Sequence, residues 1–277
     1  MTGAAREQHG AGSATRPGIG AGGRQDPEVR TRRAPASDPG PDAGRARAGA
    51  DPIRVLIVDD HASLAGAMAM AINGRAGMRC VGSVVSIAGA LTAVTTLDPD
   101  VVLLDVFLPD GNGIDVIPQL LAARPGVRIL VLTGHTDVDA LARAATAGAS
   151  GFLPKESTIE AVIAAIKAAS EGQLLVDGTT LASILGRLAQ SSRQAREVVD
   201  QVPTLTPREH DVLALMGQGL DPHAISLELG ISVNTTRGYL KGLMRKLGAH
   251  SQLEVIVISS RNGLLPQATG LPRPTGS

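Results

Sequence analysis

The sequence predicts an α/β domain with a doubly wound, five-stranded parallel sheet, followed by a small all-α domain of four helices. Two observations predict this fold class. Between residues 53 and 170, short runs rich in Val, Ile and Leu alternate with segments of helical pattern. From Thr206 onward, helix-capping residues and glycines divide the chain into four short helices. A length of 277 residues is enough for about two domains.

The predicted strands are apolar runs without polar alternation, which is typical of strands buried on both faces of a parallel sheet. They lie at 53–58, 80–85, 101–104, 128–132 and 151–153, and the helical segments lie at 64–73, 87–97, 113–123, 138–147 and 158–170. Ser157 and Glu160 have the spacing of a capping box at the start of the last of these helices. The alternation of strand and helix predicts one α/β domain over residues 52–172.

Residues 173–203 are predicted to be a linker with a short helix at 180–188. The all-α domain, 204–265, begins where Thr206 can cap a helix, Pro207 can occupy its first turn and Glu209 can complete a capping box. The remaining helix boundaries follow from similar signals. Gly219 ends the first helix, and the second runs from Asp221 to Gly230. The third helix runs from Ser232 to Gly248, and the fourth begins with a capping box at Ser251 and Glu254 and ends at Asn262-Gly263.

The two ends of the chain are predicted to be disordered tails, at 1–51 and 266–277. The first 51 residues are dominated by Gly, Ala, Arg and Pro, so they have little apolar surface with which to offset the entropy of ordering. Three interpretations remain open for this tail: a weakly basic arm for DNA, a solvated tail without a function, or a start codon assigned too early. A signal peptide is not expected, because the tail has no apolar core segment.

Composition excludes several classes of protein. Lys plus Arg and Asp plus Glu are 26 each, so the chain is not a globally basic nucleic-acid wrapper. Cys80 is the single cysteine, which excludes a disulfide framework and a cysteine-rich zinc site. Aromatic residues make up 1% of the chain, too few for a base-stacking surface. A reduced, cytoplasmic protein fits this cysteine usage. The uncharged stretch 80–97 is rich in Gly, Ser and Thr, so no membrane span is expected.

Chemically active side chains follow the predicted strands. Asp59 and Asp60 follow the first strand, Asp105 the third, Thr133 the fourth and Lys155 the fifth. Because ligand sites in doubly wound sheets lie at the carboxyl ends of the strands, we expect these side chains to converge.

This set of side chains suits phosphoryl transfer. Clustered carboxylates favour a hard cation such as Mg²⁺, and an aspartate can accept a phosphoryl group as an acyl phosphate. A lysine supplies a second positive charge for the phosphoryl oxygens, and a threonine hydroxyl can donate a hydrogen bond to them. The sequence has neither a Walker-A loop nor a glycine-rich dinucleotide motif as a competing phosphate site.

The segments VVLLD at 101–105, LPDGNG at 108–113 and GASGFLPK at 148–155 resemble those of CheY-like receiver domains, which have a flavodoxin-like fold. The resemblance implies that Asp105 accepts a phosphoryl group from a sensor histidine kinase. It implies that Asp60, Asp105 and the backbone carbonyl of Phe107 bind the metal, with Asp59 acting largely through bound water.

The same resemblance assigns Thr133 and Lys155 to the phosphoryl group, and Phe152 to the aromatic switch residue whose rotamer follows Thr133. Many family members have Tyr where this chain has Phe152, so here the switch lacks a phenol. His135 lies two residues after Thr133. It either borders the phosphoryl group and affects dephosphorylation, or is an ordinary exposed loop histidine.

The helix predicted from Ser232 has one apolar and one polar face. Thr236, Leu240, Leu243 and Leu247 share the apolar face. The opposite face has no acidic residue and presents Asn234, Gly238, Lys241 and Arg245, with Arg237 at its edge. This pattern is typical of a recognition helix in the DNA major groove, and Thr235 at the helix start suits a phosphate. The alternative is an ordinary amphipathic helix with a solvated basic face.

The segments LTPRE at 205–209, LELGIS at 227–232 and RKLG at 245–248 resemble a LuxR-type helix-turn-helix. The resemblance places DNA contacts at Arg237, Gly238 and Lys241, and dimerisation on the last helix. Receiver and helix-turn-helix together resemble a NarL/FixJ-type response regulator. Such a protein binds double-stranded DNA, takes its phosphoryl group from a sensor histidine kinase and forms a homodimer when phosphorylated or on DNA, without membrane contact.

Two alternatives are weighed against a phosphorylation-switched transcription factor. The first is a pseudo-receiver regulator that binds DNA independently of phosphorylation, and the intact acidic set counts against it. The second is a phosphatase acting through an aspartyl phosphate, which needs an acid two residues after Asp105. Phe107 occupies that position, so we do not expect an enzyme beyond the receiver's own phosphotransfer and dephosphorylation.

Overall fold

The computed structural model describes residues 51–134, 137–194 and 204–265, with side chains described up to residue 190 within the second range. The predicted disorder of the two tails concerns segments outside these ranges, apart from Asp51. His135 also lies outside them, so both interpretations of that residue stay predictions.

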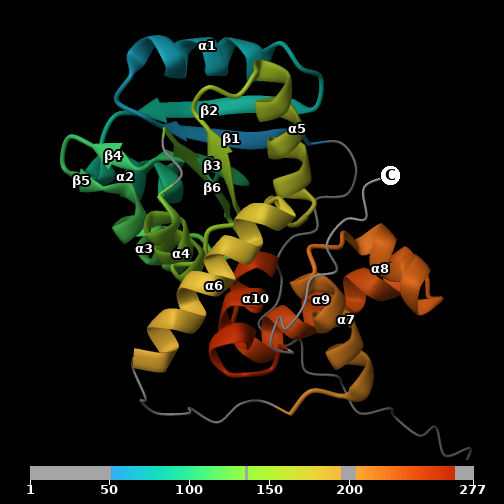
Figure 1. The fold of residues 1–277 in the computed structure, drawn as a ribbon. Coiled ribbons are helices and arrows are strands. Elements are labelled where there is room, and N and C mark those ends of the chain that lie inside the picture. The colour runs from blue at the N-terminus through green and yellow to red at the C-terminus, as the bar shows by residue number, and fades with distance from the viewer. Residues whose placement is uncertain (1–50, 135–136, 195–203, 266–277) are drawn as a thin grey trace, which may run out of the picture. The chain divides into compact units, whose positions relative to one another are not determined.

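A five-stranded, wholly parallel sheet forms the centre of the first part of the chain (Figure 1). Its strands are β1 Ile53–Val58, β2 Met78–Val84, β3 Val101–Asp105, β6 Arg128–Thr133 and β7 Gly151–Pro154. The strand order is β2-β1-β3-β6-β7, which confirms the predicted doubly wound sheet. The order reverses between β1 and β3, and that switch point is where such sheets bind ligands.

Helices cover both faces of this sheet, and each face has its own apolar core. α1 Ala62–Asn73 and α5 Ile159–Ser170 bury their apolar residues on one face. α2 Ile87–Thr96, α3 Ile117–Ala123 and α4 Val138–Thr146 contribute to the core on the other face. All five residues of β3 are buried, as expected for a central strand between two helical layers.

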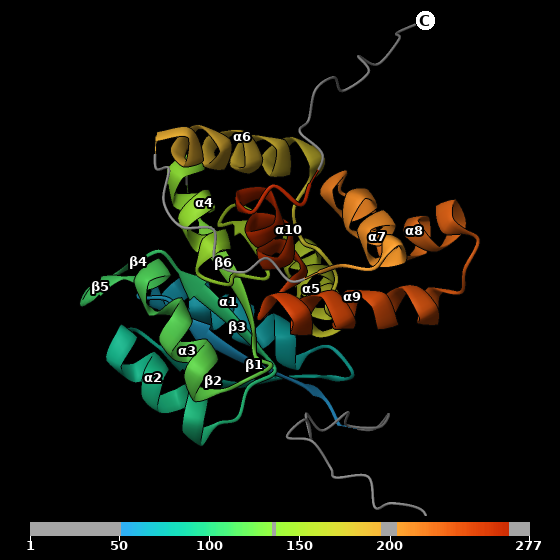
Figure 2. The same ribbon diagram turned by 90° about the horizontal axis from the view of Figure 1, so that it is seen from below.

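Four helices, α7 Pro207–Gly217, α8 Pro222–Leu229, α9 Val233–Leu247 and α10 Gln252–Arg261, form the second part of the chain and confirm the predicted all-α domain. α7, α8 and α9 pack on one another (Figure 2). α10 packs against α7 and α9, and seven of its ten residues are buried, the polar Gln252, Glu254 and Ser259 among them.

The capping signals explain where these helices begin and end. Thr206 and Glu209 form the predicted capping box, with both reciprocal hydrogen bonds present. Gly230 and Gly248 end their helices in the left-handed conformation, with φ of 62° and 65°, where a side chain would be strained. The start of each of these helices is therefore fixed by a side chain, and the ends of α8 and α9 by glycines.

Two predicted capping boxes were wrong in detail. The N-cap of α5 is Thr158, whose hydroxyl accepts a hydrogen bond from the Ala161 N–H, and not Ser157. Ser251 does cap α10, but the Glu254 carboxylate accepts from the N–H of His250 at 2.6 Å instead of completing a box. Adjacent Ser and Thr residues offer equivalent hydroxyls, so residue type alone does not decide between neighbouring caps.

The linker helix and one hairpin differ from the prediction. The linker helix, α6, spans Gly178–Gln194 and is longer at both ends than the predicted 180–188. Its Leu181 and Ile184 are buried in the apolar cluster that includes Leu141 of α4. A hairpin of two-residue strands, β4 Phe107–Leu108 and β5 Gly111–Asn112, was not predicted, since strands of that length carry no periodicity. Within the described ranges, no helix combines the length and apolar character needed to span a bilayer.

Candidate functional site

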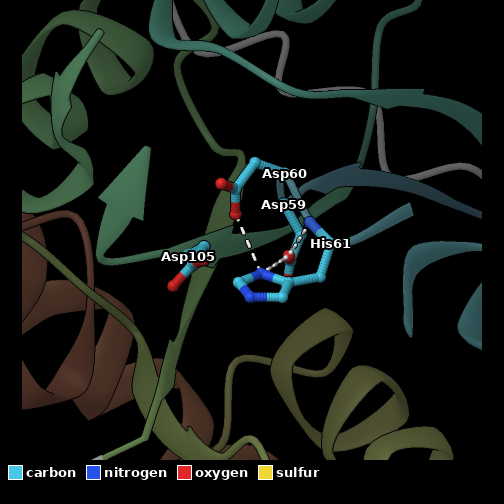
Figure 3. Close-up of side chains that lie close together, drawn as sticks. All are labelled: Asp59, Asp60, His61 and Asp105. Carbon is cyan, nitrogen blue, oxygen red and sulfur yellow. Dashed lines mark hydrogen bonds and ion pairs between the residues drawn. The ribbon is translucent and has the colours of Figure 1, made fainter. Parts of the chain in front are cut away.

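Three aspartates meet at the carboxyl edge of the sheet, as the sequence predicts (Figure 3). Asp59 and Asp60 follow β1, and Asp105 is the last residue of β3, the adjacent strand. One ligand atom from each, together with one from His61, lies within 4.8 Å of the others. Asp59 and Asp105 are fully buried, whereas Asp60 is partly exposed. The site therefore places two buried carboxylates beside a third, Asp60, that water can reach.

Lys155 supplies positive charge to the buried carboxylates. Its Nζ lies 2.5 Å from Asp105 Oδ2 and 3.5 Å from Asp59 Oδ2. It follows β7 directly, and its backbone N–H donates to the carbonyl oxygen of Thr133 at 2.8 Å, which fixes where the side chain starts. Buried carboxylates without a cation are strongly destabilising, so this lysine compensates the negative charge of the site.

The buried carboxylates are held by backbone donors, but one atom lacks a hydrogen bond. Asp59 Oδ1 accepts from the His61 N–H at 2.8 Å, and Asp105 Oδ1 accepts from the Phe107 N–H at 3.3 Å. Asp59 Oδ2 is buried without a hydrogen-bond partner, and its nearest cation is the lysine 3.5 Å away. An additional cation would satisfy this oxygen, so the residues present fit a metal ion.

His61 also belongs to this site, although it was not among the residues predicted from the sequence. Its Nδ1 lies 2.8 Å from Asp60 Oδ1 and 3.1 Å from Asp59 Oδ1 (Figure 3). The signal that could have identified it is its position directly after the aspartate pair, where the chain turns from β1 into α1.

Thr133 ends the strand next to Asp105. Asp105 is aligned with Leu132 in the register of β3 and β6, so Thr133 lies one residue further along at the same edge. A Cβ built on Gly134, the next residue, would meet nothing within 4 Å, so there is open space beside Thr133. Phe152, in β7, is partly buried against apolar residues of two clusters. The roles of Thr133 and Phe152 in phosphoryl binding and switching stay predictions.

Phe107 and Gly113 shape the rim of the site. The Phe107 ring is 75% exposed, and the role of its backbone carbonyl as a metal ligand stays a prediction. Gly113 closes the LPDGNG segment noted in the sequence, but its close contact with Asp105 was not predicted. A Cβ at this position would lie 2.0 Å from the carbonyl oxygen of Asp105, so only glycine lets the chain pass behind the acidic residue. Its N–H donates to the Val106 carbonyl at 2.8 Å, which closes the loop after β3.

The polar face of α9 is the second candidate site. The side chains predicted to contact DNA are all exposed: Asn234, Thr235, Arg237, Lys241 and Arg245, with Gly238 between them. Thr236, Leu240 and Leu243 are buried on the opposite face, which confirms the predicted apolar face. Helix α9 has no acidic residue, so its exposed face is positively charged. Which of these residues contact DNA stays a prediction.

Lys246 shows that one cation of α9 has a structural role. Its Nζ lies 2.6 Å from the carboxylate of Glu209, which also accepts from the Thr206 N–H at 2.8 Å. The Lys246 ammonium, followed by the Thr206 N–H, holds the pKa of Glu209 below its ordinary value. This interaction joins α9 to the start of α7 and so braces the helix that carries the exposed cations.

A phosphoacceptor-type acidic site on a doubly wound sheet, joined to a helix-turn-helix with a basic face, defines a receiver coupled to a DNA-binding domain. Comparison with known families agrees. The model of the response regulator receiver domain matches residues 55–167, and that of the bacterial regulatory proteins of the luxR family matches 203–259.

The chain is similar over its two domains to curated regulators. It is 32% identical over 208 residues to the DNA-binding transcriptional activator DevR/DosR of Mycobacterium tuberculosis, covering 75% of this chain and 94% of the relative. It is 28% identical to the nitrate/nitrite response regulator protein NarL of Escherichia coli, covering 75% and 94%. A crystal structure of a LuxR-family response regulator from Aurantimonas is 26% identical over 50% of this chain and 99% of that one, with a TM-score of 0.46.

This chain therefore belongs to the two-component response regulators that join a receiver to a LuxR-type DNA-binding domain. It is a DNA-binding transcription regulator and not an enzyme in the ordinary sense.

Proposed function

We propose that phosphorylation of Asp105 by a sensor histidine kinase switches this regulator, with Mg²⁺ bound in the acidic site. The observation that carries the proposal is the placement of Asp105: its carboxylate is buried beside the Lys155 ammonium and within 4.8 Å of the ligand atoms of Asp59 and Asp60. A carboxylate held between a cation and a metal-binding pair suits a phosphoryl acceptor.

The chemistry follows from these contacts. An Asp105 oxygen attacks the phosphorus of a kinase phosphohistidine, the P–N bond breaks, and the departing imidazole retains the electron pair and takes up a proton. Asp60, Asp105 and the Phe107 carbonyl would hold the Mg²⁺, with Asp59 acting through water. The metal neutralises negative charge on the phosphoryl oxygens. In this structure Lys155 pairs with Asp105. After phosphoryl transfer its ammonium pairs with one phosphoryl oxygen, and the Thr133 hydroxyl donates a hydrogen bond to another.

The output is carried by α9. Arg237, Gly238 and Lys241 meet the major groove, and Asn234, Thr235 and Arg245 flank them, because these residues share the exposed face. The regulator acts as a homodimer on a DNA site with two half-sites when phosphorylated. Residues 52–172 form the receiver, 173–203 the linker and 204–265 the DNA-binding domain. DNA and the kinase's catalytic part both reside in the cytoplasm, so we place the protein there.

The connection between the two sites runs through Phe152, α4 and α6. Phe152 packs against apolar residues on both sides of this path. Arg187 of α6 forms an ion pair with Asp139, in the first turn of α4, and donates a second hydrogen bond to it at 3.3 Å. When Thr133 moves toward the phosphoryl group, Phe152 takes a new rotamer and α4 shifts beneath α6. The energy for this shift comes from the different contacts of the two states.

A second candidate has one observation in its favour. The α9 face is exposed in the unphosphorylated chain, which suits a regulator that binds DNA without phosphorylation. The two candidates predict different effects of Asp105 substitution, so one experiment separates them.

The experiment measures phosphoryl incorporation from acetyl phosphate with Mg²⁺ on a phosphate-retarding gel, followed by light scattering and a gel shift on DNA selected from random duplexes. Wild type is compared with Asp105→Asn and with Glu156→Gln, an exposed carboxylate next to Lys155. We expect incorporation, dimerisation and tighter DNA binding in wild type and Glu156→Gln, and none of these responses in Asp105→Asn.

Equal DNA binding by all three proteins, unaffected by acetyl phosphate, would support the phosphorylation-independent candidate instead. Incorporation into Asp105→Asn would place the acceptor on another residue and overturn the proposed chemistry.

A further inference from the structure

We infer that His61 is a protein ligand of the cation in the acidic site, and that its nitrogen raises the affinity of the site for transition metals more than its affinity for Mg²⁺. The inference rests on the metal site proposed above and concerns a residue to which that proposal gives no role.

The first observation is the direction of the imidazole. His61 occupies the N-cap position of α1, but its side chain makes no capping hydrogen bond. The ring turns instead toward the aspartates, with Nδ1 between the Asp59 and Asp60 carboxylates (Figure 3). The side chain is 66% exposed, so packing does not force the ring into this orientation.

The second observation is the spacing of the donor atoms. Neighbouring ligands of an octahedral ion with bonds of about 2.1 Å lie about 3.0 Å apart. Nδ1 lies 2.8 Å from Asp60 Oδ1 and 3.1 Å from Asp59 Oδ1. Nδ1 therefore lies at the separation of a neighbouring ligand from one oxygen of each aspartate. Asp59 Oδ2, buried without a hydrogen-bond partner, independently indicates that a cation belongs there.

The chemistry of the donor atom determines which metal ions gain affinity for the site. Mg²⁺ prefers oxygen ligands and water, whereas imidazole nitrogen suits later divalent ions such as Fe²⁺, Co²⁺ and Ni²⁺. A site of carboxylates alone gains little selectivity among these ions. Adding one nitrogen raises the affinity for Co²⁺ more than that for Mg²⁺, because only the former makes a strong bond to imidazole.

A rival role for His61 is to hold the Asp60 carboxylate by a hydrogen bond, since 2.8 Å is also an ordinary hydrogen-bond distance. In that role the imidazole acts on every metal alike, through the position of the carboxylate. The two roles are separated by detecting a metal–nitrogen bond and by comparing two metals.

The test uses tag-free, full-length protein. Pulsed electron paramagnetic resonance on the Mn²⁺-loaded protein detects nitrogen bound to the metal. Calorimetric titration with Mg²⁺ and with Co²⁺ measures selectivity. The proteins are wild type, His61→Ala, and His223→Ala as a matched control, because His223 is an exposed histidine at the start of α8. His61 is largely exposed, so the alanine variant leaves no cavity, and circular dichroism checks its fold.

We expect nitrogen coupling in wild type and His223→Ala and its loss in His61→Ala. We also expect His61→Ala to weaken Co²⁺ binding at least about tenfold while Mg²⁺ binding changes by less than about threefold. Metal bound without nitrogen coupling in wild type, or an equal loss for both metals, overturns the inference and leaves the proposed metal site intact. Absence of any metal binding overturns both.

Discussion

The acidic site and the α9 face are both built from charged residues, and they differ in how those charges are placed. At the acidic site, side chains from β1, β3 and β7 converge on a buried position and compensate one another. On α9, the cations come from one helix, spread along its surface and face solvent. The charges of the first arrangement therefore contribute to the stability of the folded chain, whereas those of the second remain accessible to an oppositely charged partner.

The physical reason is the dielectric environment. Charges that converge in a buried site interact strongly, so their balance affects the stability of the fold. Exposed charges are screened by water and salt and contribute little to stability until they meet an oppositely charged surface. The following substitutions test this division.

The largest effect is expected for Lys155→Met. Removal of the ammonium leaves the buried Asp59 and Asp105 carboxylates without their cation, so we expect a loss of about 3 kcal/mol in the free energy of unfolding. Phosphoryl incorporation is expected to disappear as well. Urea unfolding followed by circular dichroism measures the first effect, and added Mg²⁺ should restore part of the stability.

Lys167→Met is the matched control, since Lys167 is exposed on α5. It should unfold like wild type. If Lys155→Met were as stable as its control, the idea that the charges of this site contribute to the stability of the folded chain would be wrong.

The next effect concerns DNA affinity. Arg237→Ala and Lys241→Ala should each weaken binding by about 1–3 kcal/mol in a gel shift, with little change in stability. Repeating the titration at several salt concentrations separates the loss of a phosphate contact, which lowers the salt dependence of binding, from the loss of a base contact, which changes it less. Arg79→Ala, an exposed cation of β2, is the control. Equal loss in all three variants would mean that general charge, and not the α9 face, determines affinity.

Glu209 gives a pH-dependent effect. Its pKa is held below the ordinary value, first by Lys246 and then by Thr206. A lowered folded-state pKa stabilises the fold above the unfolded-state pKa of about 4.3, and this stabilisation is lost as the pH falls through the lower value. We expect Glu209→Gln to lower the free energy of unfolding by about 2 kcal/mol at neutral pH, and by progressively less as the pH falls below about 4. A difference from wild type that stays constant across this range in urea unfolding would contradict the prediction.

The smallest effect is expected for Gly238→Ala. A Cβ at this position meets nothing within 4 Å, so alanine should stabilise the helix by about 0.5–1 kcal/mol. Gly242→Ala makes a similar change on a less exposed part of the same helix, 4.0 Å from the Glu209 carboxylate. If Gly238 lies against DNA, only Gly238→Ala weakens the gel shift. Equal binding by the two variants would place Gly238 away from the DNA.

Residue pattern was sufficient to predict most of the fold and the convergence of the acidic site. Strand ends of a parallel sheet share one edge, so Asp59, Asp60, Asp105 and Lys155 could be brought together from their positions after apolar runs. Helical periodicity likewise separated the buried and exposed faces of α9. Both inferences depend on regular geometry, which sequence spacing encodes directly.

The residues that were missed act through irregular geometry. His61 enters the site through the turn of the chain between β1 and α1, and Gly113 matters because a loop passes against the Asp105 carbonyl. Neither effect has a period in the sequence. The choice of Thr158 over the neighbouring Ser157 as a cap likewise has no signal in the sequence. Such details depend on the three-dimensional path of the chain, whereas the choice of DNA-contacting residues depends also on the structure of the DNA.

The burial of α10 affects how strongly dimer formation depends on the fraction of chains in which this helix is uncovered. Seven of its ten residues are inside the folded chain, so in this arrangement the helix has little surface left for a second subunit. If α10 forms the dimer, each chain must first uncover it. The apparent dissociation constant is then the intrinsic one divided by the fraction of open chains at each of the two partners. Because that fraction enters twice, a tenfold rise in open chains raises dimer formation about a hundredfold, so a modest change in one protomer gives a steep response in the assembly.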